Sequence, residues 1–107
     1  KAPVTVVKGA PEKTARYILQ NVRDKSGVLC FDEYAGLFAG HCVKAIGGAK
    51  DTAAQARRVF DALRAFDHDD VTEIFAQYPR EEGLGLAVCN RLNKAAGFHM
   101  IDLGYDT

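Results

Sequence analysis

Short apolar runs alternate with helical patterns along almost the whole of this chain. The runs are rich in β-branched and other apolar residues and carry few polar positions, as expected for strands that are buried on both faces of a sheet. The segments between them are too long for hairpins, so the strands are expected to be parallel and covered by helices. The predicted strands are Val4–Val7, Val28–Phe31, Cys42–Ile46 and Val71–Gln77, with His99–Leu103 as an optional fifth. This pattern predicts an α/β fold: a three-layer α/β/α sandwich with a mostly parallel sheet of four or five strands, Rossmann-like or flavodoxin-like.

Three segments have the apolar spacing of amphipathic helices. The first begins at Pro11, a favourable first helical residue, and extends to about Asp24. The second can be capped by Asp51 or Thr52, and the third ends at Gly97, a natural helix stop. For Tyr34–Gly40 the pattern does not decide between a short helix and a loop. The predicted apolar faces are Ala15, Ile18, Leu19 and Val22, then Ala53, Ala56, Val59, Phe60, Leu63 and Phe66, and finally Leu84, Val88, Leu92 and Ala95.

Size and charge balance restrict the class of protein. The chain has 107 residues, 14 basic and 14 acidic side chains, and 48% hydrophobic residues, so its formal net charge is 14 − 14 = 0. This composition fits one folded domain and excludes intrinsic disorder. A strongly electrostatic nucleic-acid binder carries a large basic excess, so direct nucleic-acid binding is not expected. Since no apolar run approaches the roughly 18 residues of a membrane span, no membrane partner is expected either.

The cysteines and histidines do not predict a metal site or a disulfide. Cys30, Cys42 and Cys89 form no C-x-x-C pair and lie in apolar stretches, which is typical of reduced thiols in a cytoplasmic protein. His41 precedes Cys42 directly, but neighbours in a strand point to opposite faces and cannot chelate one ion together. The acidic segment Asp67–Asp70 fits a solvated loop better than a cation site. We therefore expect no metal in this chain.

Residues that directly follow strands are the candidates for a ligand site, because open parallel sheets bind ligands outside the carboxyl ends of their strands. Asp32 and Glu33 follow the second strand, and Asp32 is near the position of a ribose-binding acid in a nucleotide domain. Because Pro11 removes an amide that a phosphate would use at the first turn, a solvated strand end is the preferred interpretation. Gly83 and Gly85 open the last helix, where backbone amides could approach a phosphate. The two glutamates just before Gly83 oppose an anion there. A tight turn with close helix packing is therefore preferred, with phosphate binding as the alternative.

Two other features could carry chemistry. Asn90 and Arg91 lie on the last helix, where the guanidinium could make a forked contact with a carboxylate of this domain, a neighbouring domain or a ligand. A helix-surface salt bridge is the simpler interpretation. Ser26 is the only serine and is expected in a turn, with no histidine placed by the sequence to activate it. A hydrolase that uses Ser26 or a cysteine has only the presence of those residues in its favour.

Two segments together resemble a known family. They are Ala56–Asp67, an aromatic-anchored helix, and Glu82–Ala96, which contains Gly-Leu-Gly-Leu-Ala-Val-Cys-Asn-Arg-Leu-Asn-Lys-Ala. They are similar to the C-terminal domain of two-domain threonylcarbamoyl-AMP synthases, a translation-factor-like family. Its second motif is Gly-[Leu/Ile/Val]-Gly-x-Ala-[Val/Ile]-Met-Asn-Arg-Leu-x-Lys-Ala. Cys89 stands where the family usually has methionine, a soft apolar exchange. The resemblance covers most of the chain as far as Gly97.

The resemblance implies an accessory C-terminal domain of a longer enzyme, and a start at Lys1-Ala2-Pro3 without an initiator methionine agrees with it. The parent enzyme is expected to condense threonine, bicarbonate and ATP into threonylcarbamoyl-adenylate, the donor for threonylcarbamoyladenosine in tRNA. Its catalytic and substrate-binding residues would lie in an N-terminal domain. No catalytic residue and no cofactor are therefore expected in this chain, and its expected partners are that domain and the linker.

The resemblance and the strand-end argument lead to two function hypotheses. The first is an accessory domain that helps to close or regulate the active site of the N-terminal domain. The alternative is an independent module that binds a small ligand or a nucleotide. The candidate residues for contacts with the other domain or with a ligand are Asp32, Glu33, Gly83, Gly85, Asn90 and Arg91.

Overall fold

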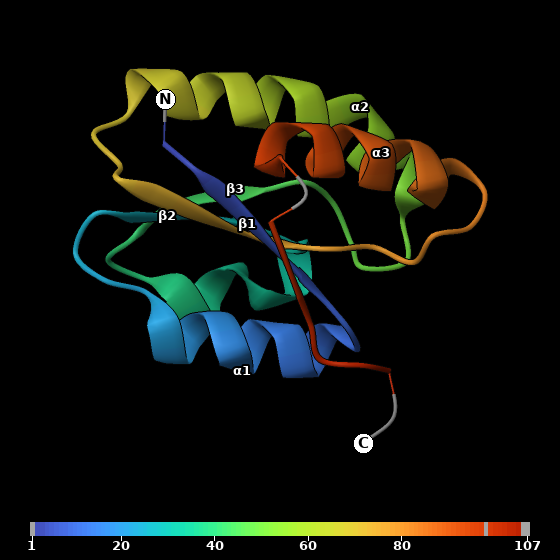
Figure 1. The fold of residues 1–107 in the computed structure, drawn as a ribbon, viewed down its shortest axis with the longest axis horizontal. Coiled ribbons are helices and arrows are strands. Elements are labelled where there is room, and N and C mark those ends of the chain that lie inside the picture. Colours follow the sequence, from blue (N-terminus) through green and yellow to red (C-terminus); the bar gives the residue numbers. More distant parts are fainter. Residues whose placement is uncertain (1, 98, 106–107) are drawn as a thin grey trace.

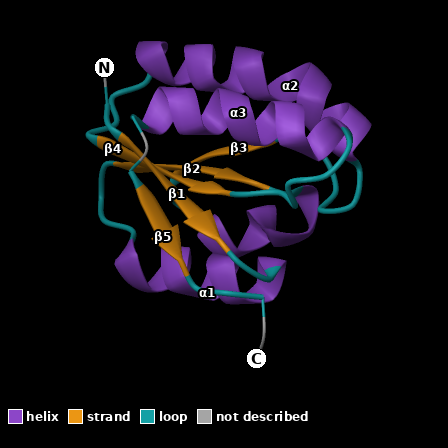
Figure 2. Cartoon of the chain, turned by 45° about the vertical axis from the view of Figure 1, so that its right-hand side comes forward, coloured by secondary structure: helices purple, strands orange, loops and turns teal. Residues whose placement is uncertain are grey.

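A five-stranded parallel sheet forms the centre of the molecule. The structure is a computed structural model that describes residues 2–97 and 99–105. The strands are β1 (Val4–Lys8), β2 (Ser26–Cys30), β3 (Cys42–Ala45), β4 (Glu73–Gln77) and β5 (Met100–Asp102). The optional fifth strand is therefore present, paired parallel to β1 at the edge of the sheet (Figure 2).

Helices cover both faces of this sheet. The α-helices are α1 (Pro11–Asn21), α2 (Thr52–Ala65) and α3 (Leu84–Ala96), and the 3-10 helices are η1 (Asp32–Phe38) and η2 (Phe66–His68). α2 and α3 lie side by side on one face, and α1 and η1 lie on the other (Figure 1). The predicted three-layer α/β/α fold with a parallel sheet is confirmed. Within the described residues, every helix falls short of the length and apolar character that a membrane crossing requires.

The strand order is β3-β2-β4-β1-β5. It differs from the 3-2-1-4-5 order at the core of a Rossmann fold by an exchange of the first and fourth strands. β4 is inserted between β1 and β2, which follow each other in the chain. Local sequence patterns did not predict this order, because they mark where a strand lies and not which neighbours it pairs with.

Apolar side chains of the strands alternate between two cores. Val4 and Val6 of β1 pack toward α2 and α3, while Val7 packs toward α1. The central strands are buried on both faces, as their continuous apolar runs predicted. The larger core also contains Leu29, Ile46, Val59, Phe66, Ile74, Val88 and Leu92, and the smaller one Ala15, Ile18, Val28, Phe38 and Phe75.

Several predicted boundaries were wrong. β2 begins at Ser26, where a turn was expected, because Ser26 already pairs with Glu73 of β4, and Gly27 lies against the ring of Phe66. A Cβ atom at Gly27 would lie 2.7 Å from that ring, so glycine here serves close packing rather than a turn. β4 begins at Glu73 and α1 ends at Asn21, each two or three residues inside the predicted limits. The segment after β2, for which the sequence left a short helix and a loop as alternatives, is a 3-10 helix.

The predicted helix faces were also partly wrong. In α2, Ala53 is exposed and Phe60 is 46% exposed, whereas Ala54 and Gln55 are buried. Small side chains mark the closest approach of α2: a Cβ atom on Gly47 would lie 2.7 Å from that of Ala54. A search for large apolar residues overlooks such contacts. In α3, the buried set is Gly85, Val88, Cys89 and Leu92, while Leu84 and Ala95 are exposed.

Candidate functional site

The two acids that follow β2 bind the backbone of their own domain. Asp32 Oδ1 accepts a hydrogen bond from the Gly47 amide at 3.1 Å, and the Asp32 amide donates to the Gly47 carbonyl at 2.9 Å. Both carboxylate oxygens of Glu33 accept from the Ala49 amide, at 3.0 and 3.1 Å. These contacts fix the loop between β3 and α2. The side chains thus already have partners within the domain, and a ligand contact for either stays a prediction.

Gly85 at the start of α3 is needed for a close approach. A Cβ atom there would lie 2.3 Å from the carbonyl oxygen of Arg80, and backbone cannot yield as a side-chain tip can. Gly83 has φ 56° and ψ −134°, a combination that favours glycine. The amides of Glu82, Gly85 and Leu86 already donate to nearby carbonyls, so these three amides are not free to hold a phosphate.

Arg91 forms part of a stacked surface cluster. Its guanidinium lies 4.5 Å from the centre of the Phe60 ring, and the guanidinium of Arg64 lies 4.6 Å from the same centre. The ring lies on α2 and is in contact with one cation from each of two helices, an arrangement stabilised by cation–π attraction. Asn90 is exposed beside it on α3. Within the part of the chain that the structure describes, the contact of Arg91 is with this aromatic ring.

A groove lies beside this cluster at the amino edge of the sheet, and we call it the amino-edge groove. It has a volume of about 430 Å³. Its apolar lining includes Ala2 and Val4 at the start of β1, and its cationic lining includes Arg64, Arg91 and Lys94. The chain therefore enters the domain along the wall of this groove.

A second cavity lies at the opposite, carboxyl edge of the sheet, and we call it the carboxyl-edge crevice. It has a volume of about 270 Å³. Among the side chains that line it are Phe31, Lys50, Tyr78, Arg80, Glu82 and Tyr105. None of the six residues predicted as contacts lines it. The sequence analysis considered acids and glycines after strands and not aromatic residues, so it did not name the side chains that line this crevice.

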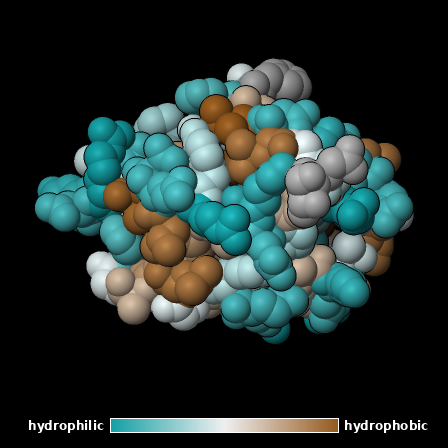
Figure 3. All heavy atoms as spheres, turned by 90° about the horizontal axis from the view of Figure 1, so that it is seen from below, coloured by the Kyte–Doolittle hydropathy of each residue, from teal (hydrophilic) through white to brown (hydrophobic). Residues whose placement is uncertain are grey.

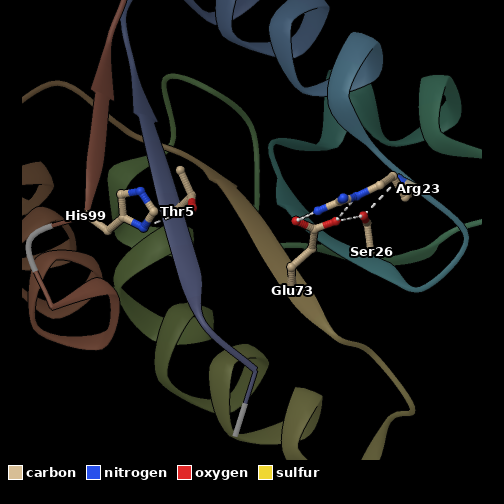
Figure 4. A network of polar contacts seen from close by, with 5 residues as sticks. All are labelled: Thr5, Arg23, Ser26, Glu73 and His99. Atoms are coloured by element: carbon tan, nitrogen blue, oxygen red, sulfur yellow. Dashed lines mark hydrogen bonds and ion pairs between the residues drawn. The ribbon is translucent and has the colours of Figure 1, made fainter.

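Ser26 does not have the surroundings of a nucleophile. It is buried, and its hydroxyl donates to Glu73 Oε2 at 2.7 Å (Figure 4). Arg23 holds the same carboxylate through two hydrogen bonds of 2.9 Å, which lowers the pKa of Glu73. His99 lies in a separate contact, 3.5 Å from the Thr5 hydroxyl (Figure 4). A serine bound to a carboxylate that is already ion-paired lacks a general base.

The thiols are not activated either. Burial raises the pKa of Cys30 to about 12 and that of Cys89 to about 11. Burial and a hydrogen bond with Asp69 raise the pKa of Cys42. Because the thiolate is the nucleophile, the raised pKa values make all three thiols less reactive than a free cysteine near neutral pH. Among the described residues, no three histidine, cysteine or acidic side chains are grouped to hold a metal ion.

A profile of the family described as "Threonylcarbamoyl-AMP synthase, C-terminal domain" matches residues 1–97. The chain belongs to this family. It is 36% identical over 103 residues to the threonylcarbamoyl-AMP synthase of Bacillus subtilis, and the match covers 94% of this chain. The same match covers only 30% of the Bacillus protein, so the chain spans less than a third of the length of this relative.

The threonylcarbamoyl-AMP synthase C-terminal domain is also called the Sua5 C-terminal domain. Solved structures contain it both as part of a longer chain and as a separate domain. Two structures of Pyrococcus abyssi Sua5, a double-alanine variant and a complex with L-threonine, are each 35% identical to this chain, with TM-scores of 0.82 and 0.78. The matches cover 99% and 95% of this chain, and 31% and 30% of the two Pyrococcus abyssi chains. A C-terminal Sua5 domain from Pyrococcus horikoshii has a TM-score of 0.70 at 30% identity. This match covers 95% of this chain and 97% of the Pyrococcus horikoshii chain. The Pyrococcus horikoshii domain therefore folds without the rest of its protein.

Proposed function

We propose that this chain is the accessory domain of a threonylcarbamoyl-AMP synthase that acts in the threonylcarbamoyladenosine modification of tRNA in the cytoplasm. The whole enzyme would use threonine, bicarbonate and ATP, and its chemistry would take place in an N-terminal domain. The observation that carries this proposal is the match of residues 1–97 to the C-terminal domain of these synthases. The chain also covers only 30% of the length of the Bacillus subtilis relative. The buried serine and the unactivated thiols described above agree with a domain that does not catalyse the reaction itself.

The amino-edge groove is the surface that we propose for contact with the linker and the N-terminal domain. Ala2 lines this groove, so a linker that leads into β1 reaches the domain there. Phe60 is 46% exposed between two guanidinium groups. Aromatic side chains and arginine are enriched at protein interfaces, where a flat ring and a planar cation give large contact areas. Arg91, predicted as an interdomain contact, lines this groove, and Asn90 precedes it on α3.

Comparison of the full-length enzyme with its isolated N-terminal domain tests the accessory role. Both proteins would be supplied with threonine, bicarbonate and ATP, and the formation of threonylcarbamoyl-adenylate measured. We expect the protein that carries residues 1–107 to have a higher kcat/KM. Equal kcat and KM for the two proteins would contradict the proposal. Circular dichroism of the isolated N-terminal domain would establish that any loss is not caused by unfolding.

A further inference from the structure

The topology of the sheet opens a crevice at its carboxyl edge. β2 leads into η1 on one face, whereas β4, its neighbour, leads into α3 on the other face (Figure 1). β1, the other neighbour of β4, leads into α1 on the same face as η1. The chain thus leaves adjacent strands in opposite directions, and the space between the diverging segments is where open α/β sheets bind ligands. The carboxyl-edge crevice lies there, lined by Gly9 after β1, Phe31 after β2 and Tyr78 after β4.

The floor of the crevice is rigid because buried hydrogen bonds hold it. The Phe31 amide donates to Gln77 Oε1 at 2.8 Å, and Gln77 Nε2 donates to the Pro11 carbonyl at 3.0 Å. The Tyr78 hydroxyl accepts from Asn93 Nδ2 at 2.7 Å. Phe31 and Tyr78 are 1% and 2% exposed, respectively. A cavity whose walls are fixed before binding costs little entropy to fill.

The lining combines flat apolar surface with positive charge. Tyr105 lies 4.7 Å from the guanidinium of Arg80, and both line the crevice together with Lys50. Two cations face one carboxylate there, that of Glu82. The neighbouring Glu81 is neutralised by Lys8, whose ammonium lies 2.7 Å from its carboxylate. The glutamates that precede Gly83 therefore do not make the site negative, and an anion is favoured.

The size of the crevice restricts the ligand further. At about 270 Å³, it lies just below the range of about 300–1,000 Å³ typical of small-molecule sites. One nucleobase with its sugar and a single phosphate fits this space better than a dinucleotide does. We propose that the carboxyl-edge crevice binds a small organic anion of the nucleoside monophosphate class, with its base against the ring of Tyr105 and its phosphate near Arg80 and Lys50. This proposal does not depend on the accessory role.

Titration of the 107-residue chain with AMP, adenosine and inorganic phosphate, followed by amide chemical shifts and calorimetry, tests the proposal. We expect AMP to bind with shifts that map to the crevice. Adenosine, which lacks the anion, and phosphate, which lacks the ring, should each bind at least tenfold more weakly. No binding of AMP, shifts that map elsewhere, or phosphate binding as tight as that of AMP would each overturn the proposal.

Variants separate the two parts of the proposed ligand. Arg80→Gln should weaken AMP binding about tenfold and leave the weak binding of adenosine unchanged, because only the phosphate contact is lost. Tyr105→Leu should weaken both. Arg57→Gln, on the exposed side of α2, serves as the matched control and should leave both affinities unchanged. Equal affinities of Arg80→Gln and Arg57→Gln for AMP would contradict the assignment of the anion site.

Discussion

The two edges of the sheet differ in how their surfaces are held. The carboxyl-edge crevice has a buried floor, in which the amide of Gln77 joins β4 to Phe31 and to Pro11. The amino-edge groove is bounded by a cluster on the helix surface, where Phe60 is 46% exposed between cations from α2 and α3. A rigid floor suits a small ligand, whereas exposed stacked side chains can adjust to another piece of protein. Substitutions at the carboxyl edge should therefore act mainly on stability, and those at the amino edge mainly on docking.

The face of the sheet that carries α1 and η1 differs from both edges. Its apolar residues form separate patches among hydrophilic side chains rather than one continuous surface (Figure 3). Leu19 on α1 and Leu37 on η1 are 44% and 50% exposed. Exposed apolar residues in small separate patches are ordinary on a folded domain, so this face gives no reason to expect a partner.

Removal of the buried amide should have the largest effect on stability. Gln77→Leu leaves the Phe31 amide without a partner, and it also removes the hydrogen bonds that Gln77 Nε2 donates to the Pro11 carbonyl and to the Thr14 hydroxyl, which remain bonded to each other. An unpaired buried amide costs about 1–3 kcal/mol and each lost hydrogen bond about 1 kcal/mol, so we expect the free energy of unfolding to fall by about 3 kcal/mol. Chemical denaturation measures the change.

The matched control for that prediction is Gln20→Leu. Gln20 lies on α1 and is exposed, so the same replacement there should change the free energy of unfolding by less than about 0.5 kcal/mol. Similar losses in the two variants would show that the floor of the carboxyl-edge crevice is not held by Gln77.

The amino-edge groove should respond in the opposite way, with loss of docking and little loss of stability. In the full-length enzyme, Phe60→Ala removes the ring that two guanidinium groups contact. Interface hot spots cost about 2 kcal/mol or more on truncation, so the enhancement of kcat/KM by this domain should fall at least tenfold. Leu37→Ala removes an equally exposed side chain on the opposite face and should have no effect. Equal activities of the two variants would place the interdomain contact elsewhere.

The sequence predicted the layers of the fold well and the contacts of the candidate sites poorly. Apolar runs and helix signals such as Pro11, the Asp51 cap and Gly97 depend on local preferences, and the structure has each where it was expected. The stack of Arg91 on Phe60 joins α3 to α2, residues 31 positions apart (91 − 60 = 31). Such contacts depend on strand order and helix packing, which single-sequence patterns do not report.

The buried face of α2 was also predicted incorrectly in part. The helix approaches its neighbours most closely at Ala54, beside Gly47. Small residues permit this approach, but a search for apolar periodicity gives them little weight, so Phe60 was assigned to the core. Its exposure is a reason to propose a role in binding, since large exposed aromatic side chains are enriched at interfaces.

The ion pair at the amino end of β2 and β4 should make stability depend on pH. Arg23 and Ser26 hold the pKa of Glu73 below its ordinary value of 4.5. A carboxylate with a lowered pKa stabilises the folded state above its unfolded value, and this stabilisation is lost as the pH falls through the folded value. Because Arg23 is largely exposed, we expect Glu73→Gln to lower the free energy of unfolding at pH 7 by only about 1–2 kcal/mol.

The difference between Glu73→Gln and the parent should shrink as the pH falls below about 4.5, because the parent then loses the same charge. Denaturation curves at pH 7, 5, 4 and 3 measure it. Asp70→Asn is the control: its pair with Lys25 is exposed on both sides, so it should change stability by less than about 0.5 kcal/mol at any pH. A difference for Glu73→Gln that stays constant down to pH 3 would contradict the linkage.

The smallest expected effect concerns cysteine labelling, and it reports on the carboxyl edge without altering the protein. Cys89 is fully buried beneath the crevice and donates to the Pro79 carbonyl at 3.3 Å. Cys42 on β3 is only partly buried. A thiol reagent at pH 8 should therefore modify Cys42 first, and Cys89 only when the floor opens. Saturating AMP should slow the labelling of Cys89 and leave the rate at Cys42 unchanged, because a ligand in the crevice stabilises its closed floor. Equal slowing at both cysteines would mean that AMP stabilises the whole domain, and no slowing at Cys89 would mean that the floor opens independently of the crevice.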